Sequence, residues 1–299
     1  MADVSRRRAA YEVPAMADVS RRRAAYASLV AARAKTRDPA LIRAFATVPR
    51  EAFCGPGPWQ VMGEAGPEIV PADDPGGLYR DVLVALLPGE GINNGEPSLH
   101  ALALAAAALR PGERVVQVGV GGGYYTAILA ELVGPEGRVD AFEVEPTLAA
   151  QAAAALAGYP QVVVHSRSGA EGPLPEADFV SVNAGATAPL ALWLDALSPT
   201  GRLIVPLTPD RGWGGLLLAR RRGPGRPADI LEARFLARTL FVPCLGARSR
   251  EGAARLGMAF AADGMDKVRS LRRGSAPDGS AWLAGEGWWL SRRRADATA

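Results

Sequence analysis

The feature that most constrains the fold of this chain is a glycine cluster that directly follows a short apolar stretch. Arg114–Val118 has the composition of a buried β-strand, and Gly119, Gly121 and Gly123 follow it before a helical pattern begins at about Tyr124. A strand, a glycine turn and a helix in this order allow the backbone to approach a ligand closely at the carboxyl end of the strand. The sequence therefore predicts a cofactor site at this junction.

Strands and helices alternate through the rest of the central region. Further strands are expected at 138–142, 162–165, 178–182 and 203–206, and helices at 124–133, 146–157 and 189–197. Two later stretches, 216–220 and 233–242, are expected to form an antiparallel pair that closes the sheet. This pattern predicts an α/β fold, namely a Rossmann-like doubly wound, mostly parallel sheet with antiparallel closing strands.

Four segments are expected along the chain. They are a disordered, duplicated segment at 1–25, a helical and loop region at 26–110 that contributes the active-site loop, a cofactor domain at 111–245 and a C-terminal extension at 246–299. The first boundary rests on the segment MADVSRRRAAY, which occupies 1–11 and recurs unchanged at 16–26. Residues 54–77 contain many glycines and prolines without a clear period and are expected to form a loop.

Composition and charge exclude several classes of function. With two cysteines and two histidines, the chain has neither a disulfide framework nor a cysteine-built zinc centre, and no metal site is expected. The net charge is +7 over 1–50, −13 over 51–210 and +9 over 211–299, and the acidic centre argues against a nucleic-acid partner. No apolar run reaches the roughly 18–20 residues of a membrane helix, so a cytoplasmic protein without a membrane partner is expected. The oligomeric state is left open.

The spacing of the glycines favours one cofactor over another. A dinucleotide fingerprint requires a glycine at position 124, where this chain has Tyr124. The G-x-G-x-G spacing suits S-adenosyl-L-methionine, whose amino-acid end needs close backbone approach and which has no pyrophosphate. Glu143 ends the second strand, where its carboxylate can accept hydrogen bonds from both ribose hydroxyls. Tyr124 is expected to pack over the cofactor.

Motifs spread over about residues 26–243 resemble the protein-L-isoaspartate O-methyltransferase family. The matching stretches are 48–53 (VPREAF), 79–81 (YRD), 91–97 with His100 and Ala101, 115–130, 137–139 with Glu143, 168–172, and 201–206 (GRLIVP). The resemblance implies an S-adenosylmethionine-dependent carboxyl O-methyltransferase that transfers a methyl group to a carboxylate of a peptide or protein substrate. It also implies that Ser168 and Gly169 lie near the adenine, and that Asn93, Asn94 and Gly95 form the catalytic loop facing the substrate.

Five positions depart from the pattern of that family. Asn93 and Asn94 stand where the family has a threonine and an isoleucine. Gly95 stands where the family has its active-site serine, Gln117 replaces the carboxylate that opens the glycine motif, and Ser168 replaces an aspartate. A carboxylate acceptor is ionised at neutral pH and needs no general base, which suits a chain with so few histidines. Two alternatives stay open. One is a catalytically degenerate S-adenosylmethionine-binding protein that regulates or binds a partner, and the other is a methyltransferase for another small substrate.

Overall fold

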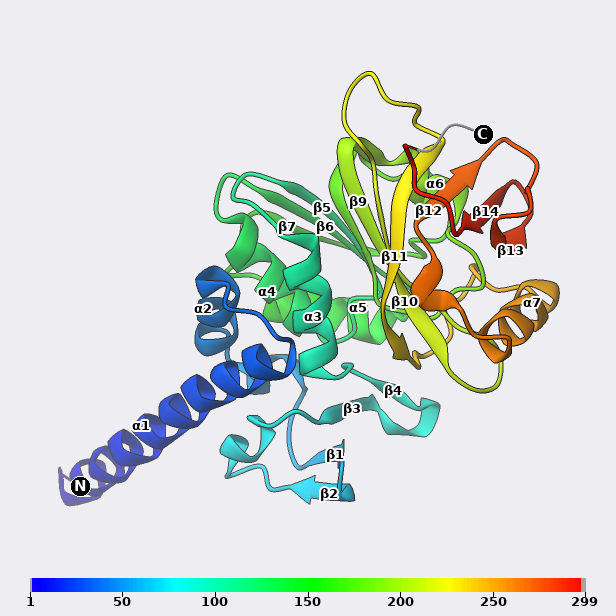
Figure 1. The fold of residues 1–299 in the computed structure, drawn as a ribbon. Helices are drawn as coiled ribbons and strands as arrows, with labels where there is room; N and C mark the ends of the chain where they lie inside the picture. Colours follow the sequence, from blue (N-terminus) through cyan, green and yellow to red (C-terminus); the bar gives the residue numbers. More distant parts are fainter. Residues whose placement is uncertain (1, 297–299) are drawn as a thin grey trace.

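A ten-stranded sheet forms the centre of the computed structural model, which describes residues 2–296 (Figure 1). Its strand order is β13-β14-β12-β11-β10-β9-β8-β5-β6-β7. The five strands at the β7 end run parallel, and those from β10 to β13 are joined by antiparallel pairings. The parallel strands are β5 (Arg114–Val118), β6 (Arg138–Glu143), β7 (Val162–Ser166), β8 (Ala177–Val182) and β9 (Leu197–Leu207). The predicted α/β class with antiparallel closing strands is confirmed.

Alternating side chains of the central strands belong to two separate cores. Val115 in β5 and Leu216 in β10 (Gly214–Arg220) pack with the N-terminal helices, whereas their neighbours Val116 and Leu217 pack on the opposite face. The sheet is therefore buried on both faces, which explains why its strands are mainly apolar on both sides instead of alternating between apolar and polar residues.

Helices cover both faces. The first core contains α2 (Pro39–Thr47), α3 (Pro97–Ala107), α4 (Tyr124–Val133) and α5 (Pro146–Ala155) together with part of α1 (Ala2–Arg33), and the second contains α6 (Ala191–Asp195) and α7 (Arg250–Ala261). Asp38 caps α2, as expected, by accepting hydrogen bonds from the backbone N–H groups of Ala40 and Leu41.

The duplicated N-terminal segment is helical rather than irregular. Helix α1 runs through both copies of the repeat, and Arg23 in the second copy donates hydrogen bonds to the Tyr79 hydroxyl and the Thr47 carbonyl. The folded part of the chain therefore begins before the expected boundary at residue 25. The physical reason is that Val19 packs against the first core and Arg23 hydrogen-bonds to Tyr79 and Thr47, which the repeated sequence does not reveal.

A second sheet occupies the region that was expected to be loop. Strands β1 (Trp59–Gly63), β2 (Gly66–Val70), β3 (Leu83–Leu87) and β4 (Ile92–Asn93) pair in the order β2-β1-β3-β4. Trp59, Val61 and Val70 form a small core with Val84, so the prediction of a loop over 54–77 is wrong. The prolines and glycines stand mainly at strand ends and turns, where they are compatible with short strands.

The C-terminal residues extend the central sheet. Strand β12 (Ser270–Arg273) pairs with β11 (Ile230–Thr239), and the hairpin β13 (Ala281–Gly285) and β14 (Trp288–Ser291) pairs with β12. Trp282 is buried against Phe260 of α7, and Trp288 is buried in the same second core. The strands within 270–291 are thus continuous with the sheet, while the role of the extension stays a prediction.

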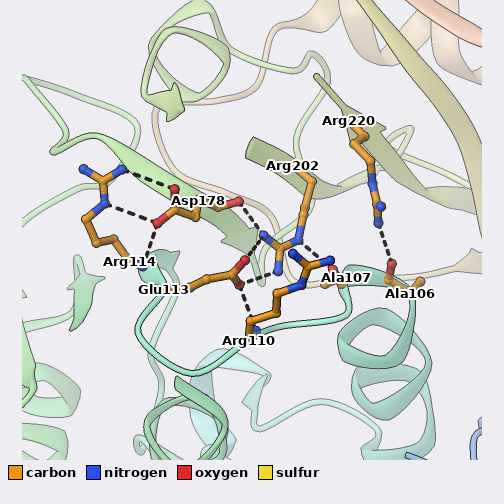
Figure 2. A network of polar contacts seen from close by, with 8 residues as sticks. All are labelled: Ala106, Ala107, Arg110, Glu113, Arg114, Asp178, Arg202 and Arg220. Atoms are coloured by element: carbon orange, nitrogen blue, oxygen red, sulfur yellow. Dashed lines mark hydrogen bonds and ion pairs between the residues drawn. The ribbon is translucent and has the colours of Figure 1, made fainter. Parts of the chain in front are cut away.

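A polar network, buried at Arg202 and exposed at Arg114, ties the amino ends of the parallel strands together (Figure 2). Arg202 of β9 donates hydrogen bonds to both carboxylate oxygens of Glu113, at 3.0 and 2.6 Å, and to the carbonyls of Ala107 and Asp178. Arg114 of β5 pairs with the Asp178 carboxylate at 3.2 Å. The network lies at the end of the sheet opposite to the glycine loop and so stabilises the scaffold rather than the site.

Candidate active site

The glycine loop between β5 and α4 has a backbone that only glycine adopts without strain. Gly119, Gly121 and Gly123 have φ angles of +83°, +57° and +96°, in the left-handed region that side chains disfavour. The glycine between them is required for a different reason, because a Cβ on Gly122 would lie 1.9 Å from the carbonyl oxygen of Phe53. The loop is therefore fixed against the 3-10 helix η1 (Arg50–Phe53).

Glu143 at the end of β6 anchors this loop. Its side chain accepts hydrogen bonds at Oε2 from the N–H groups of Val120 and Gly121, at 2.9 and 2.8 Å, and at Oε1 from the N–H of Glu145 at 3.0 Å. A carboxylate has about four acceptor positions, so one position on Oε1 remains for a hydroxyl. The carboxylate predicted to bind the ribose thus also shapes the loop that would hold the cofactor.

Gln117 lies fully buried beneath the same loop. Its Nε2 donates to the Gly119 carbonyl at 3.3 Å, but Oε1 has no hydrogen-bond partner among the described residues. An unsatisfied buried acceptor costs about 1–3 kcal/mol. This position, where the family pattern has a carboxylate, therefore holds an acceptor that is ready for a donor.

Ser168 and Gly169 follow β7 at the same end of the sheet. The register places Glu143 opposite Ser166 of β7, so the loop after β7 begins beside the ribose-binding candidate. A Cβ on Gly169 would lie 2.7 Å from Val118 Cγ2, which explains the glycine. Ser168 uses its Oγ as an acceptor for the N–H of Ala170. Its hydroxyl thus shapes the turn at this position.

Tyr124 does not lie over the glycine loop. Its ring is buried in the first core beside Phe45 and Phe53, and its hydroxyl is 3.2 Å from that of Tyr26. Burial raises the pKa of this phenol well above its usual value. The expectation that Tyr124 packs over the cofactor is corrected, because the helix turns this residue inward and turns Tyr125 toward the loop that carries Gly95.

The loop with Asn93, Asn94 and Gly95 is held from both sides. Asn94 accepts hydrogen bonds at Oδ1 from Val84 N–H at 2.9 Å and from Arg50 at 3.4 Å, so its side chain faces inward. Asn93 accepts from Gly95 N–H at 2.9 Å, which closes a local turn. The Tyr125 hydroxyl donates to the Gly95 carbonyl at 3.1 Å. Because Tyr125 directly follows the glycine loop, this bond joins the predicted substrate loop to the predicted cofactor loop.

Arg50 is a functional candidate that the sequence does not single out within the VPREAF motif. It is fully buried and donates to the carbonyls of Leu78, Arg80 and Val82 at 2.6–2.9 Å, and to Asn94. Among the described residues it forms no ion pair. A positive charge without an acidic partner therefore lies behind the predicted substrate loop, residues 93–95, which is called the acceptor loop from here on. The contacts join residues distant in sequence, and only the VPREAF motif could have pointed to them.

Neither of two other candidate groups can act as a base or nucleophile here. His100 in α3 stacks on Tyr125 with ring centroids 3.7 Å apart, and burial together with the Arg50 charge lowers its pKa to about 3. Burial raises the pKa of the Cys54 thiol to about 11. Both side chains are therefore neutral at pH 7. The site favours an acceptor that arrives already ionised.

Comparison with known proteins identifies the family. The sequence model described as Protein-L-isoaspartate(D-aspartate) O-methyltransferase (PCMT) matches residues 78–248, more than half of the chain. The chain belongs to this family. Its relatives include the protein-L-isoaspartate O-methyltransferases of Methylorubrum populi (35% identical over 212 residues, 70% of this chain and 88% of that one) and Methylorubrum extorquens (37% over 213 residues, 70% and 82%).

A solved structure agrees on the fold. A Plasmodium falciparum protein described as a protein-L-isoaspartate O-methyltransferase in complex with S-adenosyl-L-homocysteine aligns with a TM-score of 0.60 at 18% identity, covering 75% of this chain and 98% of that one. Family membership makes this chain an S-adenosylmethionine-dependent methyltransferase. Its own residues fit that cofactor, because Gln117 offers an unsatisfied acceptor beneath the glycine loop and Glu143 keeps one acceptor position.

Within residues 2–296, none of the helices combines the length and hydrophobicity needed to cross a bilayer.

Proposed function

We propose that this enzyme methylates the free α-carboxylate of isoaspartyl residues in peptides or proteins. The observation that carries the proposal is the hydrogen bond from Tyr125 to the Gly95 carbonyl, because it joins the acceptor loop to the glycine loop. Those two loops correspond to the methyl-acceptor and cofactor segments of the family. The cytoplasmic location and the protein partner stay predictions.

The roles of the site residues follow from their contacts. Gly119, Gly121 and Gly123 would let the backbone approach the cofactor, and Glu143 would accept a ribose hydroxyl at Oε1. Gln117 would accept a hydrogen bond from the ammonium group, and Ser168 with Gly169 would border the adenine. When bound, S-adenosylmethionine supplies a methyl group on a sulfonium, which is open to in-line displacement.

The chain's own residues then have to orient the acceptor and exclude water. The acceptor oxygen forms the new C–O bond as the C–S bond breaks, and the opposite charges of the two groups cancel, so no proton has to move. Arg50 and Asn94 hold the acceptor loop, and the positive charge of Arg50 favours an anionic acceptor beside it. Alignment of this kind accounts for much of the rate of such reactions.

The decisive experiment measures methyl transfer from labelled S-adenosylmethionine to matched peptides that contain isoaspartate or aspartate. We expect label in the isoaspartyl peptide with an equal release of S-adenosylhomocysteine, and none in the aspartyl peptide. The exposed variant Glu251→Gln in α7 is the control and should match the wild type. Binding of S-adenosylhomocysteine without turnover on either peptide would refute the proposal and favour a degenerate cofactor-binding protein.

A further inference from the structure

The structure shows what takes the place of the missing side chain at position 95. A Cβ on Gly95 would lie 2.4 Å from His100 Nε2 and 3.0 Å from its Cδ2, and the residue has a φ of +77°. Contacts that short do not occur in proteins, so a serine cannot be added here while the imidazole keeps its position. Gly95 and His100 are therefore a matched pair.

His100 is held rigidly in this position. It lies in the first two turns of α3, stacks on Tyr125 at an interplanar angle of 14° and meets the edge of Phe241 with centroids 6.1 Å apart. Among the described residues its ring makes these aromatic contacts but no hydrogen bond. A neutral imidazole has one donor and one acceptor. The donor and the acceptor of the His100 ring are thus both available for a hydrogen bond at the acceptor loop.

We propose that His100 presents Nε2–H to the acceptor carboxylate and so replaces the hydroxyl that the family carries at position 95. This inference rests on the proposed function, because it names the group that positions the acceptor in the same site. A neutral imidazole can donate to one carboxylate oxygen and leave the other oxygen free to attack. No proton is transferred, so the arrangement suits a carboxylate that is already ionised.

The first test replaces the ring nitrogens and keeps the stack. His100→Phe should fold and bind S-adenosylhomocysteine like the wild type, while its kcat/KM for the isoaspartyl peptide falls by about 10- to 100-fold, the value of one hydrogen bond to a charged group. His100→Gln, which keeps an N–H donor, should recover part of the loss. The exposed variant Glu251→Gln in α7 is the control and should leave kcat/KM unchanged.

The second test uses the matched pair. Gly95→Ser alone should reduce both activity and stability, because its side chain meets the imidazole. In the double variant Gly95→Ser/His100→Ala the imidazole no longer blocks the serine side chain and a hydroxyl is present at position 95. Its activity should therefore exceed that of Gly95→Ser and that of His100→Ala, each measured alone. Strictly additive losses across these variants would overturn the proposal.

Binding measurements separate this inference from the proposed function. Wild-type enzyme and His100→Phe are each saturated with S-adenosylhomocysteine, and the Kd of the isoaspartyl peptide for each loaded enzyme is measured by calorimetry. A weaker Kd in His100→Phe supports the role of His100 even if the wild type shows no turnover, which would refute only the proposed reaction. An unchanged Kd and kcat/KM in a folded His100→Phe variant would overturn the inference.

Discussion

Breaking the pair between Arg202 and Glu113 tests how the amino ends of the parallel strands are held (Figure 2). The Arg202 side chain is 5% exposed and that of Glu113 is 19% exposed. In Glu113→Ala the guanidinium keeps only two backbone carbonyls as acceptors, those of Ala107 and Asp178. The change also removes the acceptor of the Arg110 N–H.

The expected loss follows from these contacts. Two charge-assisted hydrogen bonds disappear, each worth about 1.5–3 kcal/mol, and removing one partner of a buried ion pair costs about 3–5 kcal/mol. Because Glu113 is partly exposed, water can enter the vacated space, and we expect about 3 kcal/mol, near the lower end of that range. At about 2–4 °C per kcal/mol this lowers Tm by about 6–12 °C.

Urea unfolding followed by circular dichroism measures the effect. The matched control is Glu251→Ala in α7, which removes an exposed pair with Arg255 and should cost at most about 0.5 kcal/mol. Replacing both buried partners, as Glu113→Leu/Arg202→Met, should recover most of the loss, because neither charge is then left unpaired. A folded Glu113→Ala variant within about 1 kcal/mol of the wild type would refute the reasoning, since it lies below the range for a buried pair.

Three further predictions concern the site. The pKa of His100 is about 3 in the folded chain and near 6.5 in the unfolded chain, so the unfolded chain binds more protons between these two pH values. The contribution of His100 to the free energy of unfolding therefore falls by about 1.4 kcal/mol per pH unit as the pH drops from 6 to 4. His100→Phe should lose that slope in urea unfolding at pH 7, 6 and 5, and an unchanged slope would contradict the assigned pKa. Gln117→Met removes the unsatisfied Oε1, so the free energy of unfolding should stay equal or rise. The Kd for S-adenosylhomocysteine should rise in the same variant, and an unchanged Kd would exclude a contact between Gln117 and the cofactor. Glu143→Gln removes the charge and replaces one acceptor oxygen by an NH2 group, which cannot accept from a backbone N–H or a ribose hydroxyl. Calorimetry should therefore show at least tenfold weaker binding of S-adenosylhomocysteine, whereas wild-type affinity would show that the carboxylate is dispensable.

The central sheet could be predicted from sequence because its signals are local. Each of the predicted central strands is a short, mainly apolar stretch, and the glycines at 119, 121 and 123 are required by their own backbone angles. Strands β1 and β2 gave no such signal, because glycine and proline stand within them and they depend on Val61 and Val70 meeting in a small core. Pairing across distant segments decides such strands.

The candidate site shows the same division. The position of Glu143 follows from the length of one strand and turn, so the sequence located it at the correct end of the sheet. The inward direction of Tyr124 depends on which face of α4 meets Tyr26, and Tyr26 lies 98 positions away. The contact between Gly95 and His100 depends on a positive φ at Gly95, which residue identity permits but does not require.

Arg50 links these departures to a single electrostatic property of the site. Its charge is fully buried and unpaired among the described residues, and it contributes to the lowered pKa of His100. A field that disfavours a proton on His100 also disfavours a cationic acceptor and favours an anionic one at the same place. The loss of the serine hydroxyl therefore leaves the preference for a carboxylate intact, because that preference is set by a buried guanidinium behind the loop, while the neutral imidazole supplies the directional contact.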